Sequence, residues 1–184
     1  MNSVGTIRDK EVVRRIKEEA AKMGREPGLL VLIGLNTGLR ISDILMLRVS
    51  DFRTRGYIVR REQKTGKQTE IRIDPAVVNQ VVRWTADMDD DALLFPKKQM
   101  TSKQPHLDRS TAYDWINKAC RRAGVKGPVG CHTLRKTYGY HFYQTFKDLA
   151  ALMIHFNHAS EQITKRYIGL TQHEVNKLTT KFRL

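Results

Sequence analysis

The apolar residues at the N-terminal end of the chain recur at the spacing of α-helices. Residues 8–24 carry four apolar side chains at helical spacing and end near a glycine, which predicts an amphipathic helix. A second helix is predicted to open at Pro27 and to stop at Gly38, and its apolar sequence indicates that it is buried. A short third helix is predicted over residues 41–47.

The period of the pattern changes in the middle of the chain. Residues 57–63 and 69–73 flank the sequence KTGKQ, and Ile71 and Ile73 alternate with charged neighbours. Two such segments on either side of a glycine-containing turn predict a β-hairpin.

Beyond the hairpin the pattern is again mostly helical. Pro75 is predicted to open a helix that runs to about residue 86, residues 93–95 form a predicted short strand, and residues 97–108 a loop. Further helices are predicted from about residue 109 to 122 and over 132–146, 147–156, 160–168 and 171–182. The predicted fold class is therefore a mostly helical α+β domain with one small antiparallel β-sheet.

The length of the chain indicates the number of domains, and its charge indicates the class of partner. A chain of 184 residues suits a single domain, here residues 1–184. Its 33 Lys and Arg residues outnumber its 19 Asp and Glu residues, which gives a net charge of +14. Such an excess favours nucleic acid, because each phosphate that is neutralised releases condensed counterions. A basic protein without a specific partner is the alternative that charge leaves open.

The sequence lacks the features of membrane, secreted and metal-binding proteins. No apolar run approaches the roughly 20 residues of a membrane-spanning helix, and the N-terminal segment lacks the apolar core of a secretory signal. Cys120 and Cys131 have no CxxC spacing, and His155 and His158 have no third ligand at a suitable spacing. We therefore expect a cytoplasmic protein with no metal site, and the basic charge adds the expectation that it is nucleoid-associated.

Two short segments place arginines where they can bind a phosphate. In TGLRISDIL, Arg40 stands at the junction of two predicted helices, and Asp43 is close enough to orient it. In HTLRKTYGY, His132 and Arg135 stand three residues apart and share one helical face. An imidazole beside a guanidinium can exchange a proton while the guanidinium holds a phosphate oxygen. Taken singly, each segment favours the ordinary alternative of a surface arginine or a chance HxxR spacing.

A third segment, MIHFNHASEQITKRYIG, combines a histidine with a tyrosine. On one continuous helix, His158 and Tyr167 would be nine residues apart and would face nearly opposite ways. A break at residues 157–160, where Ser160 is a suitable N-cap, lets both side chains face one site. Of the six tyrosines, Tyr167 alone follows a second histidine near the C-terminus.

The predicted hairpin turn carries two lysines. Lys64 and Lys67 lie at its tip or its flanks. A hairpin can deliver an ammonium group into a DNA groove, or to a leaving oxygen that needs a proton. A solvated turn without chemistry is the alternative.

The order of these residues resembles the catalytic domain of the tyrosine recombinases, the phage integrase family. GLRISDILMLR resembles the first arginine box of the family, and HTLRKTYGY resembles its HxxR box. The hairpin lysine has its match in Lys64, and NHAS followed by Tyr167 resembles the second histidine and the nucleophile. The resemblance extends from the first predicted helix to the last, and it implies six catalytic residues: Arg40, Lys64, His132, Arg135, His158 and Tyr167.

Three positions depart from the pattern of the family. Asn157 stands where Gly is usual, Ala159 where Ser is frequent, and Lys136 where His is common. None of these changes removes a catalytic group, although Asn157 bears on the backbone of the predicted break. Members of the family usually carry an N-terminal core-binding domain. We expect that domain to be absent here, because the chain begins directly with catalytic-domain sequence.

The resemblance implies site-specific DNA recombination by strand cleavage and rejoining, without a metal or another cofactor. Tyr167 would attack the DNA and remain bonded to the 3′ phosphate while the two arginines bind the phosphate oxygens. His132 would assist removal of the tyrosine proton. Lys64 would protonate the 5′ oxygen, and His158 would hydrogen-bond the phosphate. Two guanidinium charges are also expected to favour the phenolate form of the nucleophile.

The resemblance further implies a homo-tetramer on double-stranded DNA. Residues 172–184 carry Val175, Leu178 and Phe182 on a predicted helical stripe. This stripe either docks on a neighbouring subunit or packs on its own domain. Three rival functions remain: a non-catalytic DNA-binding module, type IB-like topoisomerase activity and, from charge alone, an RNA-binding protein.

Overall fold

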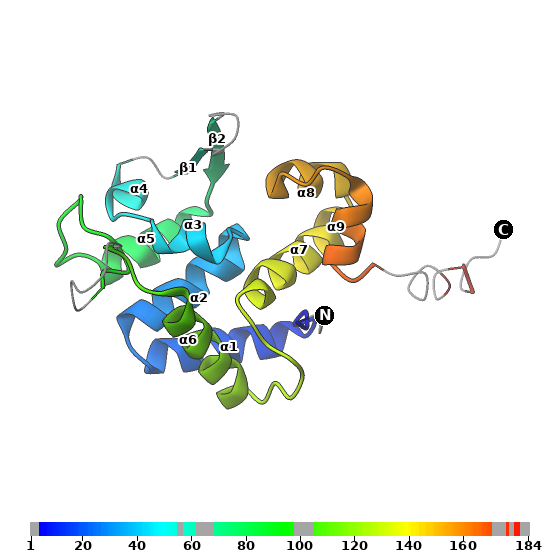
Figure 1. Ribbon diagram of the computed structural model, residues 1–184, viewed down its shortest axis with the longest axis horizontal. Helices are drawn as coiled ribbons and strands as arrows, with labels where there is room; N and C mark the ends of the chain where they lie inside the picture. The colour runs from blue at the N-terminus through cyan, green and yellow to red at the C-terminus, as the bar shows by residue number, and fades with distance from the viewer. Residues whose placement is uncertain are drawn as a thin grey trace.

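The computed structural model describes residues 4–54, 57–61, 68–97, 105–170, 176 and 179–180. In this part of the chain it is mostly helical, with one two-stranded antiparallel sheet, so the predicted fold class is confirmed (Figure 1). The elements are α1 (Lys10–Lys22), α2 (Arg25–Thr37), α3 (Ile41–Leu45), α4 (Ser50–Arg53), β1 (Tyr57–Arg61), β2 (Gln68–Arg72), α5 (Pro75–Trp84), α6 (Arg109–Arg122), α7 (His132–Phe146), α8 (Leu149–Phe156) and α9 (Glu161–Tyr167).

The predicted hairpin is present, and its register agrees with the alternation in the sequence. Strands β1 and β2 pair Ile58 with Ile71, and both side chains are buried. A strand directs alternate side chains to one face, so this pair anchors the hairpin on the core. The turn that carries Lys64, like the tail of residues 172–184 apart from 176 and 179–180, lies outside the described residues.

Two predictions about the elements were wrong, and one short helix was not predicted. Residues 93–95 do not form a strand, because Leu93 makes only an isolated bridge with Arg48. The apolar run there reflects burial, since Leu94 and Phe95 are core residues. The second helix begins at Arg25, two residues before the proline predicted to open it. Helix α4, only one turn long, had no periodic signal to predict it.

Helix α2 is the central element of the larger core. Ten of its thirteen residues are buried, which explains why its sequence is apolar on all sides. It contacts α1, α5, α6 and α7, and Figure 1 shows it in the middle of the helices on the left of the view. Its C-terminal end therefore lies at a fixed place beside α7. Every helix in the described ranges is too short or too polar to cross a bilayer.

Helices α7, α8 and α9 enclose a second, smaller core. Leu152, Phe156 and Ile168 are its buried residues, and aromatic side chains of α7 pack against them. Figure 1 shows α8 and α9 beyond α7, on the side away from α4 and α5. This cluster holds the C-terminal end of α9 close to α7.

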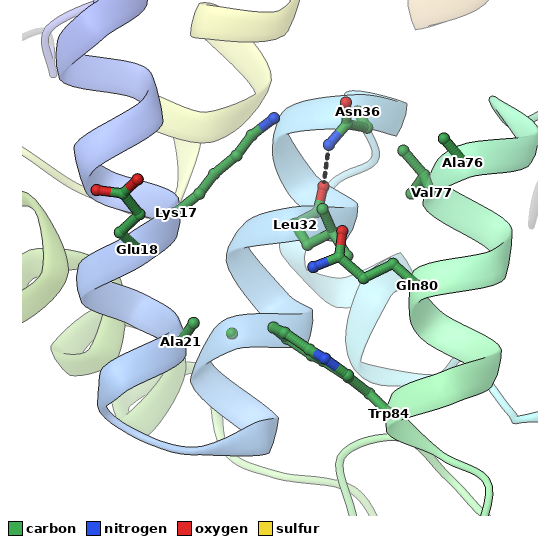
Figure 2. A pocket seen from close by; sticks show the side chains of 10 residues that line it. Lys17, Glu18, Ala21, Leu32, Asn36, Ala76, Val77, Gln80 and Trp84 are labelled. Carbon is green, nitrogen blue, oxygen red and sulfur yellow. Dashed lines mark hydrogen bonds between the residues drawn. The ribbon is translucent and has the colours of Figure 1, made fainter.

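A groove lies between α1, α2 and α5. Figure 2 shows the ring of Trp84 reaching across from α5 toward α2, with Lys17 of α1 on the other side. The ring lies over Gly28, where a Cβ atom would come within 2.6 Å of it. The five predicted catalytic residues that the structure describes do not line this groove.

Gly38→Ala should lower the free energy of unfolding by about 1–3 kcal/mol. Gly38 ends α2 in the left-handed region with φ of 62°, and an added Cβ would overlap the ring of Tyr138. Gly127→Ala is the matched control, because Gly127 has open space around it. Urea denaturation measures both variants, and equal stabilities would contradict this account of the turn.

Candidate active site

Arg40 lies at the turn between α2 and α3. The left-handed Gly38 reverses the chain, Leu39 is buried, and Arg40 precedes α3 in an extended conformation with its side chain exposed. The carbonyl oxygen of Arg40 accepts hydrogen bonds from the backbone N–H groups of Asp43 and Ile44. This backbone is therefore fixed while the guanidinium reaches solvent.

Helix α7 carries His132 at its first position and Arg135 one turn later. The start of the helix is held by a reciprocal pair of bonds, in which the Thr133 N–H donates to the carbonyl oxygen of Gly130 and the Gly130 N–H donates to Oγ1 of Thr133. His132 is exposed, whereas Arg135 is buried. The imidazole of His132 therefore lies at the surface, and the guanidinium of Arg135 lies beneath it in the protein.

Arg135 joins three segments that are distant in the sequence. Its side chain is only 2 % exposed, and its Nη1 and Nη2 donate to the carbonyl oxygens of Gly38 (2.6 Å) and Phe156 (2.9 Å). Its Cζ also lies 4.0 Å from the centre of the Phe156 ring. Burying a charge is costly unless its donors are bonded, so these carbonyl oxygens make the position possible.

The predicted break before Tyr167 is present. Helix α8 ends at Phe156, Asn157 is left-handed with φ of 49°, and Oγ of Ser160 accepts from the N–H of Ile163 at the start of α9. Asparagine tolerates this conformation better than other residues with a side chain. Asn157 therefore preserves a helix-ending turn at a position where glycine is the usual choice.

Tyr167, at the end of α9, contacts both predicted histidines. Its Oη lies 3.0 Å from Nδ1 of His132, and its ring centre lies 5.3 Å from that of His158. The prediction that the break brings His158 and Tyr167 to one place is confirmed by this contact. By contrast, Tyr138 stacks on His155, whose Nε2 is 2.7 Å from the carbonyl oxygen of Thr37.

Burial and the arginines act in opposite directions on Tyr167. Burial raises the pKa of the Tyr167 hydroxyl above its ordinary value, and the charges of Arg135 and Arg40 lower it by less. The arginines therefore favour the phenolate, but in the absence of DNA the effect of burial is larger and the hydroxyl stays protonated at neutral pH. Removal of the proton then needs a base within hydrogen-bond reach, and His132 holds that position.

Both histidines are held in the neutral form. Partial burial lowers the pKa of His132, and the charges of Arg109, Arg135, Lys136 and Arg40 lower it further. A neutral imidazole has a nitrogen lone pair, which is what a base requires. Burial also lowers the pKa of His158 to about 4, again with contributions from Arg135 and Arg40. Arg40 is thus close enough to the cluster for its charge to act on His132, His158 and Tyr167.

The free energy of unfolding should decrease on acidification from about pH 6.5 to about pH 4, in part because of His158. Its pKa is about 4 in the folded protein, so the unfolded chain binds more protons within this window. The stabilisation is fully present above the window and is lost as the pH falls through it. His158→Gln should flatten this slope, although His132 and His141 retain their own contributions of the same sign. Urea denaturation across the window measures the slope, and an unchanged slope in the variant would refute the assignment.

Five of the six predicted catalytic residues lie in one cluster: Arg40, His132, Arg135, His158 and Tyr167. The sixth, Lys64, falls outside the described residues. Asp43 makes no ion pair with Arg40 within the described ranges. Its Oδ1 accepts from the Ser42 hydroxyl (3.3 Å), and its buried Oδ2 has no hydrogen-bond partner in that part of the chain. Its supporting role stays a prediction.

Among the described residues, Phe156, Lys136 and Thr164 contact the cluster and were not predicted as site residues from the sequence. Phe156 contributes a carbonyl oxygen and a ring to Arg135. Lys136 places Nζ 5.7 Å from the centre of the Tyr167 ring and donates to the carbonyl oxygen of Val4 (3.1 Å). Thr164 has Oγ1 2.9 Å from Nδ1 of His158. The sequence could have identified Thr164, because it lies one helical turn before Tyr167 and on the same face of the predicted helix.

Comparison with known proteins assigns the family. The model of the phage integrase family matches residues 7–174. A probable integrase/recombinase of Bacillus subtilis, YoeC, is 37 % identical over 172 residues, which cover 94 % of this chain and 93 % of that protein. The tyrosine recombinase XerA of Pyrococcus furiosus is 26 % identical over 95 % of this chain, which spans 60 % of that relative.

Solved structures agree on the fold. A crystal structure of XerA recombinase superposes with a TM-score of 0.76 at 21 % identity, covering 100 % of this chain and 66 % of that one. The catalytic domain of the bacteriophage HP1 integrase superposes with a TM-score of 0.64 at 21 % identity, covering 97 % and 95 %. The chain therefore belongs to the phage integrase family and has the catalytic-domain fold of the tyrosine recombinases.

Proposed function

We propose that residues 1–184 form the catalytic domain of a site-specific recombinase that cleaves and rejoins DNA through a 3′-phosphotyrosyl bond to Tyr167. The contact that carries this proposal is the 3.0 Å hydrogen bond between Tyr167 Oη and His132 Nδ1, beside the guanidinium of Arg135. This arrangement would bring a nucleophile, a neutral base and a cation to one phosphate.

In the cleavage step, Tyr167 Oη attacks the phosphorus and its proton passes to His132 Nδ1. The bond between phosphorus and the 5′ oxygen breaks, and the departing oxygen takes a proton from Lys64. The phosphate remains bonded to the tyrosine, so one phosphodiester is exchanged for another and the reverse step can rejoin the strand.

The two arginines contribute from opposite sides. Arg40 is exposed and meets the phosphate from the solvent side. Arg135 is anchored on two carbonyl oxygens, and its Cζ lies 6.0 Å from the centre of the Tyr167 ring. It binds the same phosphate from the buried side of the site. Fixed cations stabilise the charge of the transition state without reorganising during the reaction. His158 adds a hydrogen bond to the phosphate, and Asp43 supports the segment that carries Arg40.

The partner of this domain is duplex DNA. A net charge of +14 favours a polyanion, and solved relatives include XerH bound to its difH substrate and a λ integrase tetramer bound to a Holliday junction. We extend these two features to this chain and propose that it assembles on DNA as a homo-oligomer, a tetramer during strand exchange. Residues 172–184 are the proposed link between neighbouring subunits.

Deleting residues 172–184 should weaken assembly on DNA and leave the fold intact. The apolar stripe of Val175, Leu178 and Phe182 then has its partner on another subunit. Gel-shift titration with a DNA site measures assembly, and thermal denaturation of the free protein measures the fold. Loss of folding in the deleted protein would show instead that the tail packs on its own domain.

The proposal is tested with a nicked duplex substrate that traps the covalent product. The wild-type chain, in buffer containing EDTA, should give a protein–DNA adduct that survives a denaturing gel. Tight binding without an adduct would favour a non-catalytic DNA-binding module. Relaxation of supercoiled DNA without strand exchange would favour a type IB-like topoisomerase, and preference for structured RNA would contradict the DNA assignment.

A further inference from the structure

Thr164 contacts His158 but takes no part in the steps above. It lies on α9, three residues before the nucleophile, and its side chain is fully buried. Its Oγ1 is 2.9 Å from Nδ1 of His158 and 3.5 Å from the carbonyl oxygen of Ser160. Water cannot compete for a hydroxyl at this depth, so these two groups decide where its proton points.

The two distances indicate the direction of the hydrogen bond. A hydroxyl has one proton to donate, and a contact of 3.5 Å to a carbonyl oxygen is at the limit of a hydrogen bond. The Ser160 oxygen also accepts the backbone N–H of Thr164, at 3.4 Å. Nδ1 of His158, at 2.9 Å, is the better acceptor. The Thr164 proton therefore points to Nδ1, which must then carry a lone pair.

The direction of this bond decides what His158 can do. In a neutral imidazole one nitrogen donates and the other accepts. If Nδ1 accepts from Thr164, Nε2 carries the proton and can donate to a phosphate oxygen. In the opposite arrangement Nε2 would present a lone pair to the phosphate, and the two would repel. Protonating the ring would also supply a donor, but the neighbouring arginine charges and burial oppose a third positive charge.

We propose that Thr164 is a positioning residue that holds neutral His158 in the Nε2–H tautomer, so that His158 donates a hydrogen bond to the scissile phosphate. The proposal rests on the phosphate-binding role of His158 given above. Thr164 itself touches no reacting atom and acts only through the imidazole.

The tautomer can be measured in the free protein without DNA. Nitrogen-15 NMR distinguishes a protonated ring nitrogen from one with a lone pair, and loss of the signal in His158→Ala assigns it. At neutral pH the wild type should show Nε2 protonated, Thr164→Val should show a mixture of tautomers or the Nδ1–H form, and Thr164→Ser should restore the wild-type pattern. A protonated Nδ1 in the wild type, or an unchanged tautomer in Thr164→Val, would overturn the proposal.

Cleavage rates then test the consequence. Thr164→Val should form the adduct about tenfold more slowly than the wild type, and Thr164→Ser should recover most of the rate. In a His158→Ala background, Thr164→Val should cause no further loss, because the hydroxyl acts through the imidazole. A changed tautomer with an unchanged rate, or a further loss in that background, would refute the positioning role. Failure of every variant and of the wild type to form an adduct would refute the proposed function, and the NMR result would still decide the tautomer.

Discussion

Arg135→Ala should lose both cleavage activity and stability. Removing the guanidinium takes a cation from the phosphate, which should slow adduct formation at least about 100-fold. It also leaves the carbonyl oxygens of Gly38 and Phe156 without this donor in a buried place. We expect the free energy of unfolding to fall by about 2–4 kcal/mol as a result. Urea denaturation and the nicked-substrate assay measure the two effects separately.

Arg40→Ala is the matched control for this prediction. Arg40 is exposed, so its removal should slow cleavage to a similar degree and change the free energy of unfolding by no more than about 0.5 kcal/mol. The difference between the variants separates structural anchoring from phosphate binding. If the two substitutions lowered the free energy of unfolding equally, the anchoring role assigned to Arg135 would be wrong.

Tyr167→Phe should form no covalent adduct at all while still binding DNA. The substitution removes only the hydroxyl that contacts His132, and the ring that packs against Phe156 remains. Stability should therefore change little. Tyr143→Phe is the control, because Tyr143 packs in the smaller core and should form the adduct at the wild-type rate. Adduct in the Tyr167→Phe protein would refute the choice of nucleophile.

Local spacing in the sequence was sufficient to predict most of the fold. Helix α7 begins and ends at the predicted residues, because its apolar and aromatic positions follow the helical period and His132 opens it. The break between α8 and α9 was also predicted, since Ser160 is a suitable N-cap and one helix could not bring His158 and Tyr167 together. These features depend on neighbours within a few residues.

The parts that could not be predicted depend on contacts between distant segments. Arg135 donates to the carbonyl oxygen of Gly38, which is 97 positions away in the chain, and no local pattern reports a backbone acceptor. The two arginines were expected to favour the phenolate form of Tyr167, but the direction of its pKa shift is set by burial in a core formed by three helices. The apolar run at residues 93–95 gave the wrong element for the same reason, since burial does not specify strand geometry.

The central claim is that Tyr167 becomes bonded to DNA, and mapping that bond tests it most directly. Wild-type protein is incubated with the nicked duplex, digested with protease and nuclease, and analysed by mass spectrometry. We expect the nucleotide mass on the peptide that contains Tyr167, joined through a 3′ phosphate. A nucleotide on another residue, or a 5′ linkage on this one, would contradict the account.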